Sequence, residues 1–66
     1  MSITEILHNL HERGFGVTIN YYSYETEYTV VLWQDSRVVV SSLNTSLLEA
    51  LIQVWEHSLI ASKGVL

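Results

Sequence analysis

The sequence predicts an α+β fold with the order α-β-β-β-α, in which two amphipathic helices pack on one face of a three-stranded antiparallel meander. Three observations predict it. Apolar residues recur at helical spacing near both ends of the chain, and they alternate with the period of a strand in the middle. A chain of 66 residues without cysteine or proline also predicts a single α+β domain, residues 1–66, with no linker and no disulfide.

The first helix is predicted over residues 2–13. Ser2 and Glu5 have the spacing of a capping box, in which each side chain bonds the backbone of the other residue. Arg13 and Gly14 predict its end, because a cation suits the last helical carbonyls and glycine tolerates a left-handed turn. The apolar positions that follow the helical period are Ile3, Ile6, Leu7 and Leu10.

The middle of the chain predicts three strands, rich in β-branched and aromatic residues, over residues 15–22, 27–33 and 37–42. The first hairpin turns either at Tyr24-Glu25 or across residues 23–26. Both turns give the same register, in which Val17 faces Leu32, Ile19 faces Val30 and Tyr21 faces Tyr28. These six side chains lie on one side of the sheet, because side chains alternate with period two. In that register Tyr21 and Tyr28 form a cross-strand pair that packs inward.

The other face of the predicted sheet is expected to remain open. It carries Thr18, Asn20, Tyr22, Glu27, Thr29, Val31 and Trp33. Trp33 falls opposite Gly16, where an indole covers bare backbone. The length of the second turn is left open, so either Val38 and Val40 or Val39 joins this face. With both helices on one side we expect this face, or an edge strand, to meet another protein chain; helices on opposite sides would cover it.

The second helix is predicted to begin after Asn44 or Ser46, either of which is a capping residue. Ser46 and Glu49 have the spacing of a second capping box. Lys63 and Gly64 predict the end of this helix. Its apolar stripe is Leu48, Leu51, Ile52, Trp55 and Leu59, widened by Leu47, Val54 and Ile60.

The charge balance argues against several classes of protein. Seven acidic residues against three basic ones give a net charge of −4. Proteins that bind nucleic acid gather lysine and arginine to neutralise phosphates, so direct nucleic-acid binding is not expected here. No stretch approaches the roughly 20 apolar residues of a membrane span, and the N-terminus lacks the pattern of a signal peptide. We therefore expect a cytoplasmic protein with no membrane partner.

Two groups of side chains were considered for chemistry. His8, His11 and Glu12 share a helix face at the spacing of metal ligands, but zinc prefers three or four ligands, so a solvated polar face is expected. Glu25 and Glu27 are paired carboxylates, but a hairpin end is solvated and offers no pocket to shift a pKa. The sequence therefore predicts no catalytic, cofactor-binding or metal-binding residue, and a protein that is not an enzyme.

The acidic residues allow two interpretations, which are ordinary solubility and a negative surface that occupies a groove meant for nucleic acid. Residues two apart on a strand are separated by roughly 6.6–6.8 Å, which is on the scale of successive phosphates. The residues concerned are Glu25, Glu27, Asp35, Glu49 and Glu56.

The order of elements resembles that of double-stranded RNA-binding domains over the whole chain. That family binds RNA through a basic start of its second helix and a histidine-bearing loop between strands. Here residues 45–49 read Thr-Ser-Leu-Leu-Glu, without lysine, and the hairpin is acidic. The resemblance therefore implies the topology and leaves an RNA-binding module as the third alternative.

In size, acidity, lack of cysteine and compact plan, the chain also resembles small phage-encoded inhibitors, the anti-CRISPR proteins in particular. This resemblance implies a non-catalytic protein in the host cytoplasm that binds a CRISPR effector complex and blocks access of target DNA through an acidic and aromatic surface. The alternative is a structural or assembly subunit that homodimerises through the open sheet face. The candidate partner-binding residues are Tyr22, Tyr24, Glu25, Glu27, Trp33 and Asp35.

Overall fold

A computed structural model describes the backbone of residues 1–64 and the side chains of residues 1–60. The predicted α-β-β-β-α order is confirmed, and the three antiparallel strands form one sheet in the order β1-β2-β3. The elements are α1 (Ile3–Glu12), β1 (Gly16–Tyr22), β2 (Glu27–Gln34), β3 (Arg37–Asn44) and α2 (Leu47–Gly64).

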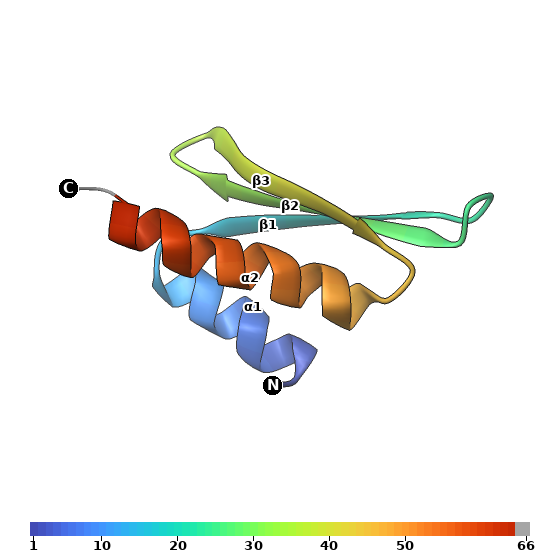
Figure 1. Cartoon of the computed structure of the whole chain (residues 1–66), viewed down its shortest axis with the longest axis horizontal. Helices are drawn as coiled ribbons and strands as arrows, with labels where there is room; N and C mark the ends of the chain where they lie inside the picture. The colour runs from blue at the N-terminus through green and yellow to red at the C-terminus, as the bar shows by residue number, and fades with distance from the viewer. Residues whose placement is uncertain (65–66) are drawn as a thin grey trace.

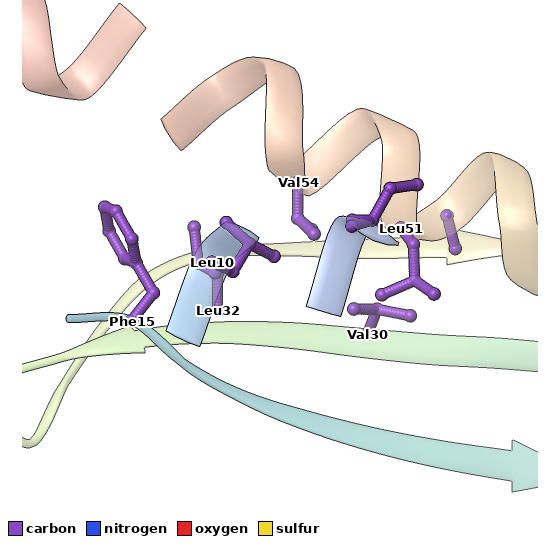
Figure 2. Close-up of a cluster of buried hydrophobic side chains, with 8 residues drawn as sticks. Leu10, Phe15, Val30, Leu32, Leu51 and Val54 are labelled. Atoms are coloured by element: carbon purple, nitrogen blue, oxygen red, sulfur yellow. The ribbon is translucent and has the colours of Figure 1, made fainter. Parts of the chain in front are cut away.

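Both helices lie on the same side of the sheet (Figure 1). The longer helix α2 packs across β2 and β3, and α1 lies beside α2 and next to β1. The core fills the space between these two layers (Figure 2). It is apolar throughout, and its buried members are Ile6, Leu10, Phe15, Val30, Leu32, Ala50, Leu51 and Val54.

The capping box predicted for α1 is confirmed. The backbone N–H of Glu5 donates to Ser2 Oγ over 3.1 Å, and the backbone N–H of Ser2 donates to Glu5 Oε1 over 3.0 Å. The bond from the Ser2 backbone, followed by that from its hydroxyl, holds the pKa of the Glu5 carboxyl below its ordinary value. Arg13 caps the other end, and Gly14 follows with φ 86, in the left-handed region where glycine carries no steric cost.

The predicted register of the first hairpin is also confirmed, with the four-residue loop across residues 23–26. Tyr21 and Tyr28 face each other with ring centroids 4.8 Å apart. The expectation that both pack inward is wrong for Tyr21, because its side chain is 53% exposed. The hairpin extends past the ends of both helices, so its tip has no helical layer to pack against (Figure 1).

The second hairpin has a two-residue loop formed by Asp35 and Ser36. Their φ values are 52 and 62, so both occupy the left-handed region. A two-residue hairpin loop with positive φ at both central positions has type I′ geometry, whose twist matches that of the flanking strands. This tight turn sets the start of β3, which continues to Asn44, two residues beyond the predicted end.

A β-bulge in β3 makes both predicted alternatives for its valines wrong. Trp33 pairs with Val38 and Leu32 pairs with Val40, so the intervening residue has no partner on β2. Val38 alone joins the open face. Val39 and Val40 both pack against the buried core.

Helix α2 begins with a cap made by two residues. The backbone N–H of Glu49 donates to Ser46 Oγ, whereas the backbone N–H of Ser46 donates to Asn44 Oδ1. Asn44 therefore takes the bond that the predicted capping box assigned to the Glu49 side chain. Gly64 is the last residue of the helix, and the side chain of Lys63 lies outside the described residues.

The apolar stripe of α2 is rotated from the predicted one. Leu48 and Leu59 are more than one-third exposed, whereas Ala50, Val54 and Ser58 are completely buried. The stripe was predicted from the large apolar residues alone. The buried positions include two small residues, Ala50 in the apolar core and Ser58 in contact with Arg13.

A polar network that was not predicted from the sequence joins the two helices. The Arg13 guanidinium donates to Asn9 Oδ1, to Ser58 Oγ and to the Ser58 carbonyl over 3.0–3.2 Å. Trp55 Nε1 donates to the same Asn9 oxygen over 2.9 Å. Ser58 is completely buried, and these bonds satisfy its hydroxyl, which itself donates to the Trp55 carbonyl.

Candidate functional site

The candidate site is the sheet face opposite the helices, called the open face from here on. The register places side chains of all three strands on it. Side chains alternate along each strand, so the residues between the core-facing ones lie on the open face. The open face consists of Thr18, Asn20 and Tyr22 of β1, Glu27, Thr29, Val31 and Trp33 of β2, and Val38, Ser41 and Leu43 of β3.

Trp33 is held in a fixed orientation on the open face. It pairs with Gly16, as predicted, and a Cβ built on that glycine would lie 3.7 Å from Trp33 Cβ. The indole Nε1 donates to Thr18 Oγ1 over 2.9 Å, so the ring leans along β1 from Gly16 toward Thr18. Trp33 is half-buried, and this burial comes from the open face itself because both helices lie on the other side.

A shallow hollow of ≈ 350 Å³ lies at the hairpin end of the open face. Its walls come from three parts of the chain, because β1 and β2 supply the floor, the hairpin loop supplies one rim and β3 supplies the other. Tyr24 in the loop is fully exposed, and Tyr22 and Leu43 are about half exposed. The lining residues are Tyr22, Tyr24, Glu25, Thr29 and Leu43.

The structure brings four of the six candidate residues together. Tyr22, Tyr24 and Glu25 line the hollow, and Glu27 pairs with Tyr22 beside it. Trp33 lies on the same face, but it is six residues from Glu27 along β2, which corresponds to roughly 20 Å.

Asp35 is separated from the four candidates at the hairpin end and lies two residues from Trp33. It lies in the turn between β2 and β3, at the end of the sheet away from the hollow. Leu43, by contrast, lines the hollow and was not among the candidates, because the third strand was predicted to end one residue before it. Glu25 lies in the loop and Glu27 on the strand, so the regular strand spacing does not apply to this pair.

The charge at the hairpin end is negative and unpaired. Among the described residues, the single ion pair joins His8 Nε2 to Glu12 Oε1 over 2.8 Å on α1, far from Glu25 and Glu27. Arg13 is bonded between the helices. Arg37 is exposed, but it begins β3 at the opposite end of the sheet.

The described residues offer little that would hold a metal or a cofactor. His8 is engaged with Glu12, and within residues 1–60 no group of three or more His, Asp or Glu side chains gathers as a metal site would require. The hollow contains one carboxylate, that of Glu25, and it is open to solvent. What the open face does present is a mixture of aromatic, aliphatic and uncharged polar side chains with an acidic end.

Neither helix, over the part of the chain that the structure describes, combines the length and the apolar character needed to cross a bilayer. Comparisons of the chain with protein families, with curated proteins and with solved structures gave no match.

Proposed function

We propose that this chain is a small non-catalytic binding protein that docks its open face, with the acidic hairpin end, onto another protein. The observation that carries the proposal is the placement of both helices on one side of the sheet, which leaves Tyr22, Val38 and Leu43 about half exposed and Trp33 half-buried on the open face. Exposed apolar side chains gathered on one face are typical of interaction sites in small soluble proteins.

The residues on this face suit a protein partner better than a small molecule. Tyrosine and tryptophan dominate the energetics of protein interfaces, because each buries a large area while losing few rotatable bonds. The bond from Trp33 to Thr18 fixes the indole before any partner arrives, so little side-chain entropy remains to be lost on binding. A flat sheet with a shallow hollow also matches the broad contact area of a protein interface.

The unpaired acids favour a basic partner. Glu25 and Glu27 lie at the end of the open face, and no cation among the described residues pairs with them. Complementary charge raises the rate of encounter and fixes the orientation of docking. Grooves that bind nucleic acid are basic, because Lys and Arg side chains in them neutralise phosphates. We therefore propose an inhibitor of the anti-CRISPR kind, which occupies such a groove in a host CRISPR effector complex and blocks target DNA.

The proposal is tested with purified CRISPR effector complexes loaded with guide RNA and with a labelled target duplex. The chain is expected to reduce DNA binding by one of these complexes in a gel-shift titration. The double variant Glu25→Lys/Glu27→Lys should require at least about tenfold more protein for the same effect, since it reverses two charges at the proposed contact.

The matched control is the double variant Glu12→Lys/Glu56→Lys, which makes the same change in net charge on exposed positions of the two helices. It should inhibit as well as the original chain. Equal losses in both double variants would mean that net charge alone matters. No effect of the original chain on any complex would contradict the inhibitor proposal, and inhibition unchanged by the hairpin variant would exclude the two acids from the interface.

A further inference from the structure

The two edges of the sheet differ in how they are protected. β3 begins with Arg37 and contains the bulge at Val39, and both charge and bulges hinder pairing with a further strand. β1 has neither device. Its sequence Gly-Val-Thr-Ile-Asn-Tyr-Tyr, residues 16–22, contains no Lys, Arg, Asp, Glu or Pro, and it pairs with β2 without a register shift.

The outer backbone groups of β1 are unpaired. In an antiparallel pair, alternate residues exchange both backbone hydrogen bonds with the neighbouring strand, and the residues between them direct their N–H and C=O groups outward. β2 lies on one side of β1 and no strand lies on the other. Within the described chain, no further backbone or side-chain group bonds the backbone of residues 16–21. This edge therefore presents a straight template for another strand.

The side of β1 that faces the helices is only half covered. Val17 packs against the core, but Ile19 is 38% exposed and Tyr21 is 53% exposed, although all three point to the same side. The cause is the placement of α1, which lies near the start of β1 and ends well short of the hairpin tip (Figure 1). In each chain, α1 therefore covers the start of β1 and leaves the end of β1 uncovered.

We propose that two copies of this chain pair antiparallel through β1, about a twofold axis at Ile19, to form a continuous six-stranded sheet. In this register Ile19 faces Ile19 of the second copy, and Val17 faces Tyr21 of the second copy. The antiparallel arrangement brings the start of β1 in one copy beside the end of β1 in the other. Helix α1 of each copy then lies next to the uncovered Ile19 and Tyr21 of the second copy. Each copy thereby covers the apolar side chains that the other leaves exposed.

The charge distribution favours a second copy as the occupant of this edge. Two chains of net charge −4 repel each other, so they associate most easily through a surface without carboxylates. Both edge strands lack carboxylates, but β3 carries Arg37 and a bulge, whereas β1 has no charged side chain and no bulge. The nearest carboxylate on the neighbouring strand is that of Glu27, which pairs with Tyr22, three residues and roughly 10 Å from the proposed axis.

This dimer is independent of the proposed function. Its axis is perpendicular to the sheet, so both open faces lie on the same side and remain accessible. Ile19 points to the helix side, and a substitution there leaves the open face unchanged. Loss of dimerisation without loss of DNA-binding inhibition, or the reverse, would separate the two proposals.

The test uses light scattering after size exclusion over a range of concentrations. The original chain is expected to reach the mass of two 7.6 kDa chains. Ile19→Lys and Ile19→Glu should each weaken association at least tenfold, because both place like charges against each other at the axis. An equimolar mixture of the two variants should restore the dimer, since opposite charges then face each other.

Val38→Lys is the matched control, because Val38 is an exposed β-branched residue on the other edge strand and belongs to the open face. It should remain dimeric. A monomeric original chain at every concentration would overturn the proposal, as would dimers of Ile19→Lys that are as tight as the original. Dissociation by Val38→Lys with no effect at Ile19 would instead identify the open face as the dimer interface.

Hydrogen exchange on the original chain gives a measurement that does not depend on whether the variants fold. Protection of the outward amides of β1 should rise with protein concentration, whereas amides of β3 should be unaffected. A rise confined to β3, or no dependence on concentration in a sample that scatters as a dimer, would contradict pairing through β1.

Discussion

On β2, Val30 and Leu32 are completely buried beneath the helices, whereas Val31 and Trp33, their neighbours in sequence, lie half-buried on the open face. The strand is apolar on both of its sides, so hydrophobicity alone does not decide which side becomes the core. The position of the helices decides it. The covered side then carries stability, and the open side is available for binding.

The largest effect expected from this comparison is a difference between two leucine truncations. Leu32→Ala removes a completely buried side chain and should lower the free energy of unfolding by about 2–5 kcal/mol. Leu43→Ala removes a side chain that is 55% exposed on the open face and should change it by no more than about 0.5 kcal/mol. Urea unfolding at one fixed protein concentration measures both.

The total stability of a chain this short is on the order of 3–5 kcal/mol, so Leu32→Ala will be largely unfolded without a stabilising osmolyte. Leu32→Val gives a milder version of the same test. Equal effects at the two leucines would mean that the open face is covered in solution, and the distinction between the two faces would then fail.

The covered side also depends on polar contacts, which the next prediction tests. Arg13→Ala removes the donor to the buried Ser58 hydroxyl and one of the two donors to Asn9 Oδ1, and we expect a loss of about 1–3 kcal/mol. The control is Arg37→Ala, which removes the same type of side chain from an exposed position and should be nearly neutral. Similar effects in the two variants would show that the network between the helices contributes little beyond surface charge.

This network marks the limit of prediction from sequence. The capping box at Ser2 and the register of the first hairpin were predicted correctly, because both are set by residues a few positions apart. Asn9 and Ser58 are 49 positions apart, and their shared contact with Arg13 depends on how α1 meets α2. The spacing of residues along one helix carries no information about how two helices contact each other, so these bonds were not predicted.

The candidate site was predicted in part for the same reason. Alternation along β1 and β2 placed Tyr22, Glu27 and Trp33 on one face correctly. Which residues of β3 lie on the open face depends on the bulge and on where the strand ends. A run of three valines gives no local signal for either. Leu43 was therefore missed, although it lines the hollow.

A smaller effect is expected at the start of α1, which anchors the covered side. Ser2→Ala removes a side chain that caps the helix and should cost about 1 kcal/mol near neutral pH. The folded pKa of Glu5 lies below its ordinary value, so the stability from its bond to Ser2 is present above that ordinary value and is lost as the pH falls through the folded pKa.

Urea unfolding at pH 7 and at about pH 3 tests this linkage. The difference between the original chain and Ser2→Ala should shrink at the lower pH. The Ser2 hydroxyl helps to lower the Glu5 pKa in the original chain and is absent from the variant, so only the original chain loses this contribution when Glu5 is protonated. A difference that stays constant with pH would mean that the hydroxyl cap acts alone and that the carboxylate contributes nothing to it.

The smallest effect is expected at the turn between β2 and β3, where the sheet itself holds a strained residue. Ser36 has φ 62, and the left-handed region costs a residue with a Cβ about 1–2 kcal/mol. Ser36→Gly removes that cost but adds the larger conformational entropy of glycine in the unfolded chain, about 0.5–1 kcal/mol. The net gain in unfolding free energy should be about 0.5 kcal/mol, and Asp-Gly is a favoured pair in type I′ turns. Ser41→Gly, at an exposed position within β3, is the control and should destabilise. A loss of stability in Ser36→Gly would indicate that the serine side chain offsets its own backbone strain. The turn between β2 and β3 would then be stabilised by Ser36 in spite of its left-handed backbone.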